Sequence, residues 1–180
     1  MAYAVEMYFD SASDKFVRET WQKLDDAGLG HSMLAAGFRP HVSLGVCNQL
    51  ARPGLHSKAL DSFFKVAPPI SFNLSSTGIF HSTEGVIFYG ATVTRQLLEV
   101  HAAFDSIFLT YAQRPWEYYR PDLWTPHCTL AIKLKPTDVS QAVHIALQAR
   151  LPLPVQVPEI GIIDVTPVSS EVLELIKLDI

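Results

Sequence analysis

A seven-residue pattern that occurs twice constrains the fold of this chain more than any other feature of its sequence. The first copy, PHVSLGV, covers residues 40–46, and the second, PHCTLAI, covers residues 126–132. The two copies agree identically or by close chemistry at every position. A glycine in a short apolar stretch, Gly78 in one case and Gly161 in the other, follows each copy at nearly the same distance. Two matches in the same order indicate an internal duplication.

The hydrophobic periodicity predicts the same order of elements in both halves: strand, helix, strand, helix, strand, with one strand left over at the end. This order predicts an α+β fold in a single domain, residues 1–180, with two similar lobes that face each other across a central cleft. Each lobe is expected to have an antiparallel-type sheet with outer helices. The expected strands cover residues 2–9, 41–46, 70–80, 85–93, 127–134, 159–165 and 171–179, and the expected helices cover 12–27, 54–66, 95–112 and 138–149.

Local signals predict how these elements begin and end. Asp10, Ser11 or Ser13 is expected to cap the first helix. Turn residues at 82–85 predict a hairpin, and the proline-dense segment 151–158 predicts a rigid connection. Pro158 and Pro167 are expected at strand ends, bulges or edges, because proline cannot donate a ladder hydrogen bond.

Composition restricts the classes of function. Hydrophobic residues make up 48% of the chain and charged residues 18%, which is enough to bury a substantial core. The net charge of -4 argues against a broad basic face for long nucleic acids. Glu6 interrupts the apolar start, no apolar run reaches the roughly 20 residues of a membrane span, and Cys47 and Cys128 lack a metal-binding pattern. We expect a cytoplasmic, monomeric protein.

Strand periodicity predicts which motif side chains share a face. Side chains alternate along a strand, so His41 and Ser43 are expected to point one way while Val42 and Leu44 point into the core. The second copy repeats this alternation, with His127 and Thr129 opposite Cys128 and Leu130. Each lobe therefore presents one imidazole and one hydroxyl, and a pseudo-twofold axis between the lobes would bring the two pairs together across the cleft.

This set of groups suits cleavage of a phosphodiester. One group must take a proton from the attacking water or hydroxyl, and another must give a proton to the leaving oxygen. Imidazole serves both purposes because its unperturbed pKa is about 6.5. The hydroxyls of Ser43 and Thr129 can donate hydrogen bonds to the non-bridging phosphate oxygens. The scheme requires neither a metal nor another cofactor.

The paired tetrads His41-Val-Ser43-Leu and His127-Cys-Thr129-Leu resemble the signature of the 2H phosphoesterase superfamily, which includes 2'-5' RNA ligase-like proteins and cyclic nucleotide phosphodiesterases. The resemblance implies a bilobal duplicated fold and metal-independent chemistry on 2',3'-cyclic, 1'',2''-cyclic or 2',5'-linked phosphates. It identifies His41 and His127 as the paired acid and base. Some members carry an aromatic residue just after the second tetrad, where this chain has Ala131 and Ile132, so the substrate subclass does not carry over.

Three further residues are candidates for substrate binding. Arg39 precedes the first Pro-His and can reach a phosphate, although its counterpart in the repeat is Thr125 and exposure to solvent is the alternative. Tyr119 and Trp124 belong to the aromatic segment 116–124, which precedes the second tetrad. This segment is either a stacking wall for a nucleobase or a loop anchored by aromatic packing.

Other interpretations of the same pattern stay open at this point. The two histidines can be ordinary strand residues or a pair of metal ligands, although neither tetrad has a further ligand beside its histidine on the same face. The chain can also be a nucleotide or RNA-end binding module without turnover, or an RNA-end ligase, although it has no P-loop. The other histidines have no partner motif and are expected on the surface or satisfied in the core: His31, His56, His81, His101 and His144.

Overall fold

The computed structural model describes residues 2–30, 33–34, 36–80, 85–165 and 170–178. It contains four α-helices, which are α1 (Ser11–Asp26), α2 (Pro53–Phe64), α3 (Arg95–Tyr111) and α4 (Val139–Ala146), and one short 3-10 helix, η1 (Glu117–Tyr119). The strands are β1 (Ala2–Tyr8), β2 (His41–Leu50), β3 (Ser71–Phe80), β4 (Val86–Ala91), β5 (Ala112–Pro115), β6 (His127–Ala131), β7 (Leu153–Gln156), β8 (Glu159–Val165) and β9 (Ser170–Lys177).

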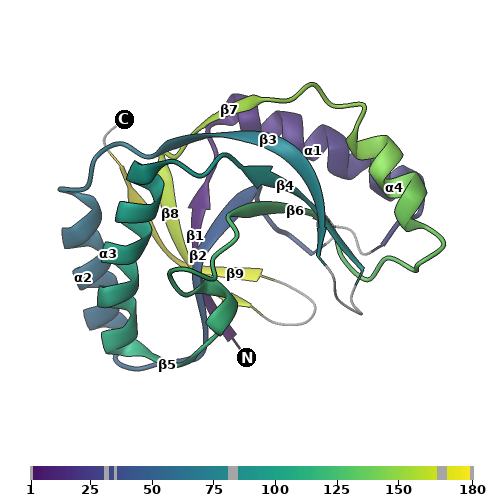
Figure 1. The fold of residues 1–180 in the computed structure, drawn as a ribbon. Coiled ribbons are helices and arrows are strands. Elements are labelled where there is room, and N and C mark those ends of the chain that lie inside the picture. Colours follow the sequence, from purple (N-terminus) through teal and green to yellow (C-terminus); the bar gives the residue numbers. More distant parts are fainter. Residues whose placement is uncertain (1, 31–32, 35, 81–84, 166–169, 179–180) are drawn as a thin grey trace.

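The strands form two antiparallel sheets with helices on their outer sides (Figure 1). The five-stranded sheet has the order β5-β2-β1-β8-β9 and packs against α2 and α3. The four-stranded sheet has the order β6-β4-β3-β7 and packs against α1 and α4. This arrangement confirms the predicted α+β fold. Within the described ranges, no helix is both long enough and apolar enough to cross a bilayer.

The two sheets share a three-stranded pattern that contains both motif strands. The pattern is β2-β1-β8 in the first sheet and β6-β4-β3 in the second, so the two motif strands, β2 and β6, occupy equivalent places. The third strand is exchanged, since β3 comes from the first half of the chain and β8 from the second. Each half therefore completes the sheet of the other.

The register of the motif strands is the same in both sheets. A bulge in β2 follows the point where Glu6 of β1 pairs with Ser43, and a bulge in β6 follows the point where Phe88 of β4 pairs with Thr129. On the other side of the same strands, Glu6 pairs with Gly161 and Phe88 pairs with Gly78. Gly78 and Gly161, which follow the two motifs at similar distances in the sequence, thus occupy equivalent positions in the two sheets.

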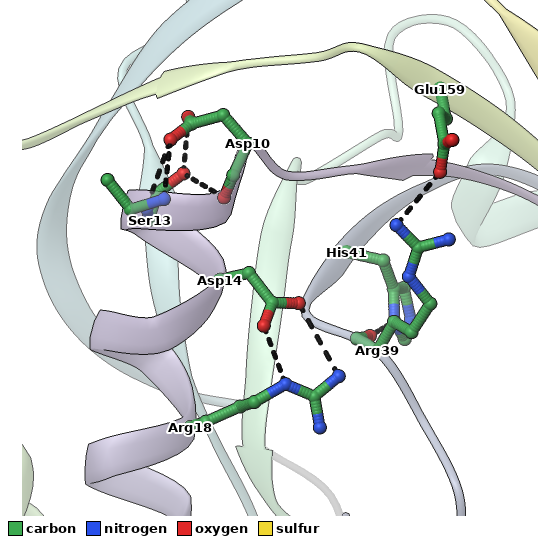
Figure 2. A network of polar contacts seen from close by, with 8 residues as sticks. Asp10, Ser13, Asp14, Arg18, Arg39, His41 and Glu159 are labelled. Atoms are coloured by element: carbon green, nitrogen blue, oxygen red, sulfur yellow. Dashed lines mark hydrogen bonds and ion pairs between the residues drawn. The ribbon is translucent and has the colours of Figure 1, made fainter.

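The first helix, α1, begins as the sequence indicates. Asp10 caps α1, because its side chain accepts hydrogen bonds from the backbone N–H groups of Ala12 and Ser13 (Figure 2). Asp10 also accepts a bond from the backbone N–H of Gln156, which ties the start of α1 to β7. The predicted apolar stripe of α1 is buried and includes Val17, Trp21 and Leu24.

The prediction of a plain connection over 151–158 was wrong, because this segment contains the edge strand β7. Pro154 lies within β7, where one side of the strand makes no ladder bonds and a missing N–H is tolerated. Pro158 precedes β8 directly, as expected. The segment between the third predicted helix and the second motif was expected to be a loop, but it contains β5 and η1. Strand β5 pairs with the end of β2. The predicted turn residues 82–84 and Pro167 lie outside the described residues.

Gly78 and Gly161 each leave room for an aromatic ring. A single methyl group added at either position should therefore destabilise the fold. A Cβ at Gly78 would collide with the ring of Phe88, and one at Gly161 would collide with the ring of Tyr8. We expect Gly78→Ala and Gly161→Ala each to lower the free energy of unfolding by about 1–3 kcal/mol in urea denaturation. Gly54→Ala in α2 is the control, since a Cβ there meets nothing and the helix should not lose stability.

Candidate active site

The two motif histidines are held in the same way. Nδ1 of His41 lies 2.7 Å from the carbonyl oxygen of Arg39, and Nδ1 of His127 lies 2.6 Å from the carbonyl oxygen of Thr125. A carbonyl only accepts, so Nδ1 carries a proton in each ring and donates it. This fixes both ring orientations and leaves Nε2 as the nitrogen of each ring that the tether does not use.

Contacts between the two sheets bring these rings close to each other. The strands β2 and β6 contact each other although they belong to different sheets. Burial raises the pKa of the Cys128 thiol, in β6, to about 12. The backbone N–H of His41, in β2, donates a hydrogen bond to the Cys128 sulfur, and this bond between the two strands lowers the pKa. Burial lowers the pKa of His127, and the nearby imidazole of His41 lowers it further. The two imidazoles therefore interact electrostatically.

The alternation predicted for the motif strands is present. Val42, Leu44, Cys128 and Leu130 are buried in the core. Ser43, His127 and Thr129 are half-buried on the other face, and His41 is 9% exposed. Each motif strand thus turns its hydrophobic side chains to the core and its histidine and hydroxyl residue to the other face. That all four residues share one cleft stays a prediction.

Two tryptophans hold the backbone of the motif strands from behind. The indole N–H of Trp21 donates to the carbonyl oxygen of Thr129 at 3.0 Å, and that of Trp124 donates to the carbonyl oxygen of Ser43 at 2.9 Å. The ring of Trp124 is buried and stacks on His101 of α3 at 3.8 Å between centroids. Trp124 therefore lies behind the motif strand and supports Ser43, which differs from its expected place as a substrate contact.

A pocket of about 560 Å³ lies beside His127 and Thr129. Most of its lining is aromatic or aliphatic, and Tyr119, a predicted binding residue, belongs to it. The pKa of Tyr119 is raised to about 12, by burial first and by the nearby Glu6 second, while a hydrogen bond with the Ser43 side chain acts in the opposite sense. The lining residues are Phe80, Val86, Trp116, Tyr118, Tyr119, Leu123, Thr125, His127, Thr129 and Ile132. No lysine or arginine is among these described lining residues.

The surroundings of the two imidazoles differ. The ring of His127 lies edge to face with Phe80 and Phe88, at centroid distances of 4.7 and 5.2 Å. The Nε2 atom of His41 instead lies 3.2 Å from Oε1 of Glu6, whose side chain is almost fully buried. Sequence reasoning missed Glu6 as a site residue. The available signal was one carboxylate within the otherwise apolar strand AYAVEMYF.

The guanidinium of Arg39 is engaged by other protein groups. Its Nη2 atom lies 2.9 Å from Oε2 of Glu159, and its Cζ lies 4.0 Å from the centre of the Tyr8 ring. Figure 2 shows Arg39 extended toward Glu159 with the His41 ring beside it. Arg39 thus lies next to the first histidine, and a direct contact with a phosphate stays a prediction.

The remaining described histidines lie away from this pair. His101 is buried and contacts the carbonyl oxygen of Leu44 through Nε2, whereas His144 is exposed. His56 is fully buried, and neither of its ring nitrogens has a hydrogen-bond partner, so burial lowers its pKa to about 4. The expectation of a satisfied core histidine was therefore wrong for His56. His31 and His81 lie outside the described residues.

A metal-binding cluster was one of the alternatives for the histidine pair. Among the residues that the structure describes, no group of three or more histidine, cysteine, aspartate or glutamate side chains is arranged to hold a metal ion. Both cysteines are buried and free of a disulfide.

Comparison with protein-family models gives a match to the 2'-5' RNA ligase superfamily over residues 10–166. The chain belongs to this superfamily. The match includes both tetrads and confirms the resemblance drawn from them. No curated protein matches the sequence significantly.

Solved structures of several other proteins have the same fold as this chain. E. coli LigT in complex with 3'-AMP has a TM-score of 0.63 at 13% identity, over 98% of this chain and 96% of LigT. TT0787 of Thermus thermophilus has a TM-score of 0.59 at 18% identity, over 99% and 98% of the two chains. Kluyveromyces marxianus Usb1 with uridine monophosphate has a TM-score of 0.52 at 12% identity, over 98% and 97%.

The supporting tryptophans can be tested by removing only their N–H groups. Trp124→Phe and Trp21→Phe keep most of the ring but leave the carbonyl oxygens of Ser43 and Thr129 without their donors. We expect each variant to lower the free energy of unfolding by about 1–3 kcal/mol in urea denaturation. Trp116→Phe is the matched control, because the Trp116 indole bonds the exposed Asn48 side chain and water can replace it. Equal losses in all three variants would contradict the supporting role.

Proposed function

We propose that this protein is a phosphoesterase that hydrolyses a cyclic phosphate, 2',3'- or 1'',2''-linked, or a 2',5'-phosphodiester in a nucleotide-like substrate. The reaction uses His41 and His127 as acid and base and needs no metal. The observation that carries the proposal is the identical tethering of the two rings, each by Nδ1 to a carbonyl. Membership of the 2'-5' RNA ligase superfamily supports the same chemistry.

The proposed reaction is an in-line displacement at phosphorus. One histidine accepts a proton on Nε2 from the attacking water, whose oxygen forms the new bond to phosphorus. The bond from phosphorus to the leaving ribose oxygen breaks, and the other histidine donates its Nε2 proton to that oxygen. The product is a phosphomonoester, and exchange of protons with solvent restores both rings.

The hydroxyls of the motifs are the proposed binding groups for the phosphate. Ser43 and Thr129 lie two residues after their histidines on the same faces of β2 and β6, so they can donate to the two non-bridging oxygens. The negative charge on these oxygens is compensated by hydrogen bonds and by a protonated imidazole. A donor fixed in advance on a strand stabilises the transition state without reorganisation.

The pocket next to His127 is the proposed site of the nucleoside. Its aromatic lining, including Trp116, Tyr118 and Tyr119, can stack on a base, and its volume of about 560 Å³ fits one nucleotide better than a strand of RNA. Complexes of LigT with 3'-AMP and of Usb1 with uridine monophosphate show that relatives of this fold hold nucleotides of this size.

Two other functions use the same cleft. A nucleotide or RNA-end binding module would bind the substrate without turnover, and an RNA-end ligase would join two ends. The pair of tethered histidines favours hydrolysis, because binding alone does not require two proton-transfer groups. A panel of 2',3'-cyclic nucleotides, ADP-ribose 1'',2''-cyclic phosphate and 2',5'-oligonucleotides distinguishes these functions, since only a hydrolase releases a phosphomonoester.

Replacement of either histidine tests the assignment directly. His41→Ala and His127→Ala should each lower kcat by roughly 10²- to 10⁴-fold, the usual contribution of general acid-base catalysis. The double variant should be only modestly worse, because the two groups act in one step. His144→Ala, at an exposed position, should keep full activity. Full activity in either motif variant would exclude the proposed mechanism.

Metal and salt dependence test the chemistry and the substrate size together. Exhaustive treatment with EDTA should leave kcat/KM unchanged, whereas a strict requirement for an added divalent ion would favour a metal mechanism. Affinity for a small cyclic phosphate should fall only slightly as salt rises, because few phosphates are contacted. A steep salt dependence would instead indicate binding along an RNA strand.

A further inference from the structure

The internal repeat places a carboxylate in one half of the site where the other half has a phenyl ring. Glu6 and Phe88 lie on the strands beside the two motif strands, and each pairs with the hydroxyl residue of its motif, Ser43 or Thr129. On the other side, each pairs with one of the two matched glycines. The two positions are therefore equivalent in the duplicated fold, and the residues there differ in charge.

This difference gives the two imidazoles unlike neighbours. His127 packs against the edges and faces of Phe80 and Phe88, which cannot stabilise an imidazolium by forming an ion pair. His41 has Oε1 of Glu6 at 3.2 Å from its Nε2 atom. Only 2% of Glu6 is exposed, so its charge has little contact with water and depends on neighbouring protein groups for stabilisation.

We propose that Glu6 is a positioning residue that keeps a proton on His41, which makes His41 the general acid and His127 the general base. This inference rests on the proposed function and specifies the role of each histidine in it. Water gives its proton to Nε2 of His127, and the proton that Nε2 of His41 shares with Glu6 passes from His41 to the leaving ribose oxygen. The two tetrads are nearly identical, so they do not distinguish the acid from the base. The residues beside them, Glu6 at His41 and Phe88 at His127, differ in charge and provide the distinction.

The physical reason is the cost of leaving a buried carboxylate without a partner. Glu6 and His41 together are neutral when they share one proton, and the loss of that proton leaves an uncompensated charge inside the protein. Burial raises the pKa of Glu6, while His41, a hydrogen bond from Tyr8 and Arg39 lower it. The 3.2 Å contact between the buried carboxylate and Nε2 of His41 is the geometric basis for the proposed role of Glu6.

Other titratable groups around this pair act on the same equilibrium. The guanidinium of Arg39 lies near Glu6 but also pairs with Glu159 of β8. The remaining neighbours are neutral or weakly acidic groups, because burial raises the pKa of the phenols and the thiol and lowers that of the second imidazole: Tyr8, Tyr119, Cys128 and His127. Glu6 is thus the carboxylate in contact with His41.

The test is the pH profile of Glu6→Gln, which keeps the shape of the side chain and removes its charge. The wild type should give a bell-shaped profile of kcat/KM, in which the basic limb reports loss of the proton from the Glu6–His41 pair. In Glu6→Gln this limb should move to lower pH by about 1–3 units, the usual effect of an adjacent opposite charge. Activity should therefore fall at least tenfold more at pH 8 than at pH 6.

Two variants serve as references. Glu174→Gln makes the same substitution at an exposed position of β9 and should leave the profile unchanged. Glu6→Asp keeps the charge at a longer distance and should restore part of the basic limb, which also covers the case in which Glu6→Gln does not fold. A uniform loss of activity in Glu6→Gln at every pH, without movement of the limb, would reduce Glu6 to a structural residue and overturn the proposal.

A measurement without substrate separates this inference from the proposed function. The ring titration of His41 can be followed by 15N NMR, with its signals assigned by their loss in His41→Ala. The midpoint should move to lower pH in Glu6→Gln and stay in place in Glu174→Gln. An unchanged midpoint in Glu6→Gln overturns the inference even in an active enzyme. A shifted midpoint in a protein that hydrolyses none of the phosphodiesters overturns the proposed function and leaves the charge coupling intact.

Discussion

Exchange of one strand between the two halves is the constraint on which the rest of this structure depends. Without β8, strand β1 would lose its second partner, and without β3, strand β4 would lose its own. Neither half can complete its sheet alone, so the lobes must form together. Their union brings β2 and β6 into contact and places the tethered imidazoles near each other. The site therefore exists only in the completed fold.

A symmetric framework is combined here with an asymmetric site. Bulges, glycines and the tethers of Nδ1 are repeated in both halves. These repeated elements hold the backbone and the rings. The residues that differ, Glu6 and Phe88, lie beside the imidazoles of His41 and His127 instead. Proton transfer through two groups needs one of them charged and the other neutral, and a perfectly symmetric site would not distinguish them.

The sequence predicted the parts of the candidate site that follow from strand periodicity and repetition. His41, Ser43, His127 and Thr129 were identified because their spacing and their duplication are local properties. Glu6 was missed because its proximity to His41 depends on the pairing of β1 with β2, which no local pattern specifies. The position of Trp124 behind Ser43 depends likewise on packing against α3. Strands β5 and β7 were missed because each contains a proline, which argues against a strand except at an edge.

The edge strands β5 and β7 also affect whether a strand of another molecule can add to the sheets. A sheet edge offers unpaired N–H and C=O groups to any strand that approaches, and this is a common route to aggregation. Here β5 and β7 each end one sheet, and each carries a proline, Pro115 or Pro154, whose nitrogen has no hydrogen to donate. An incoming strand cannot form a complete ladder at these edges. The prolines that argued against these strands in the sequence thus also disfavour addition of a strand at these two edges.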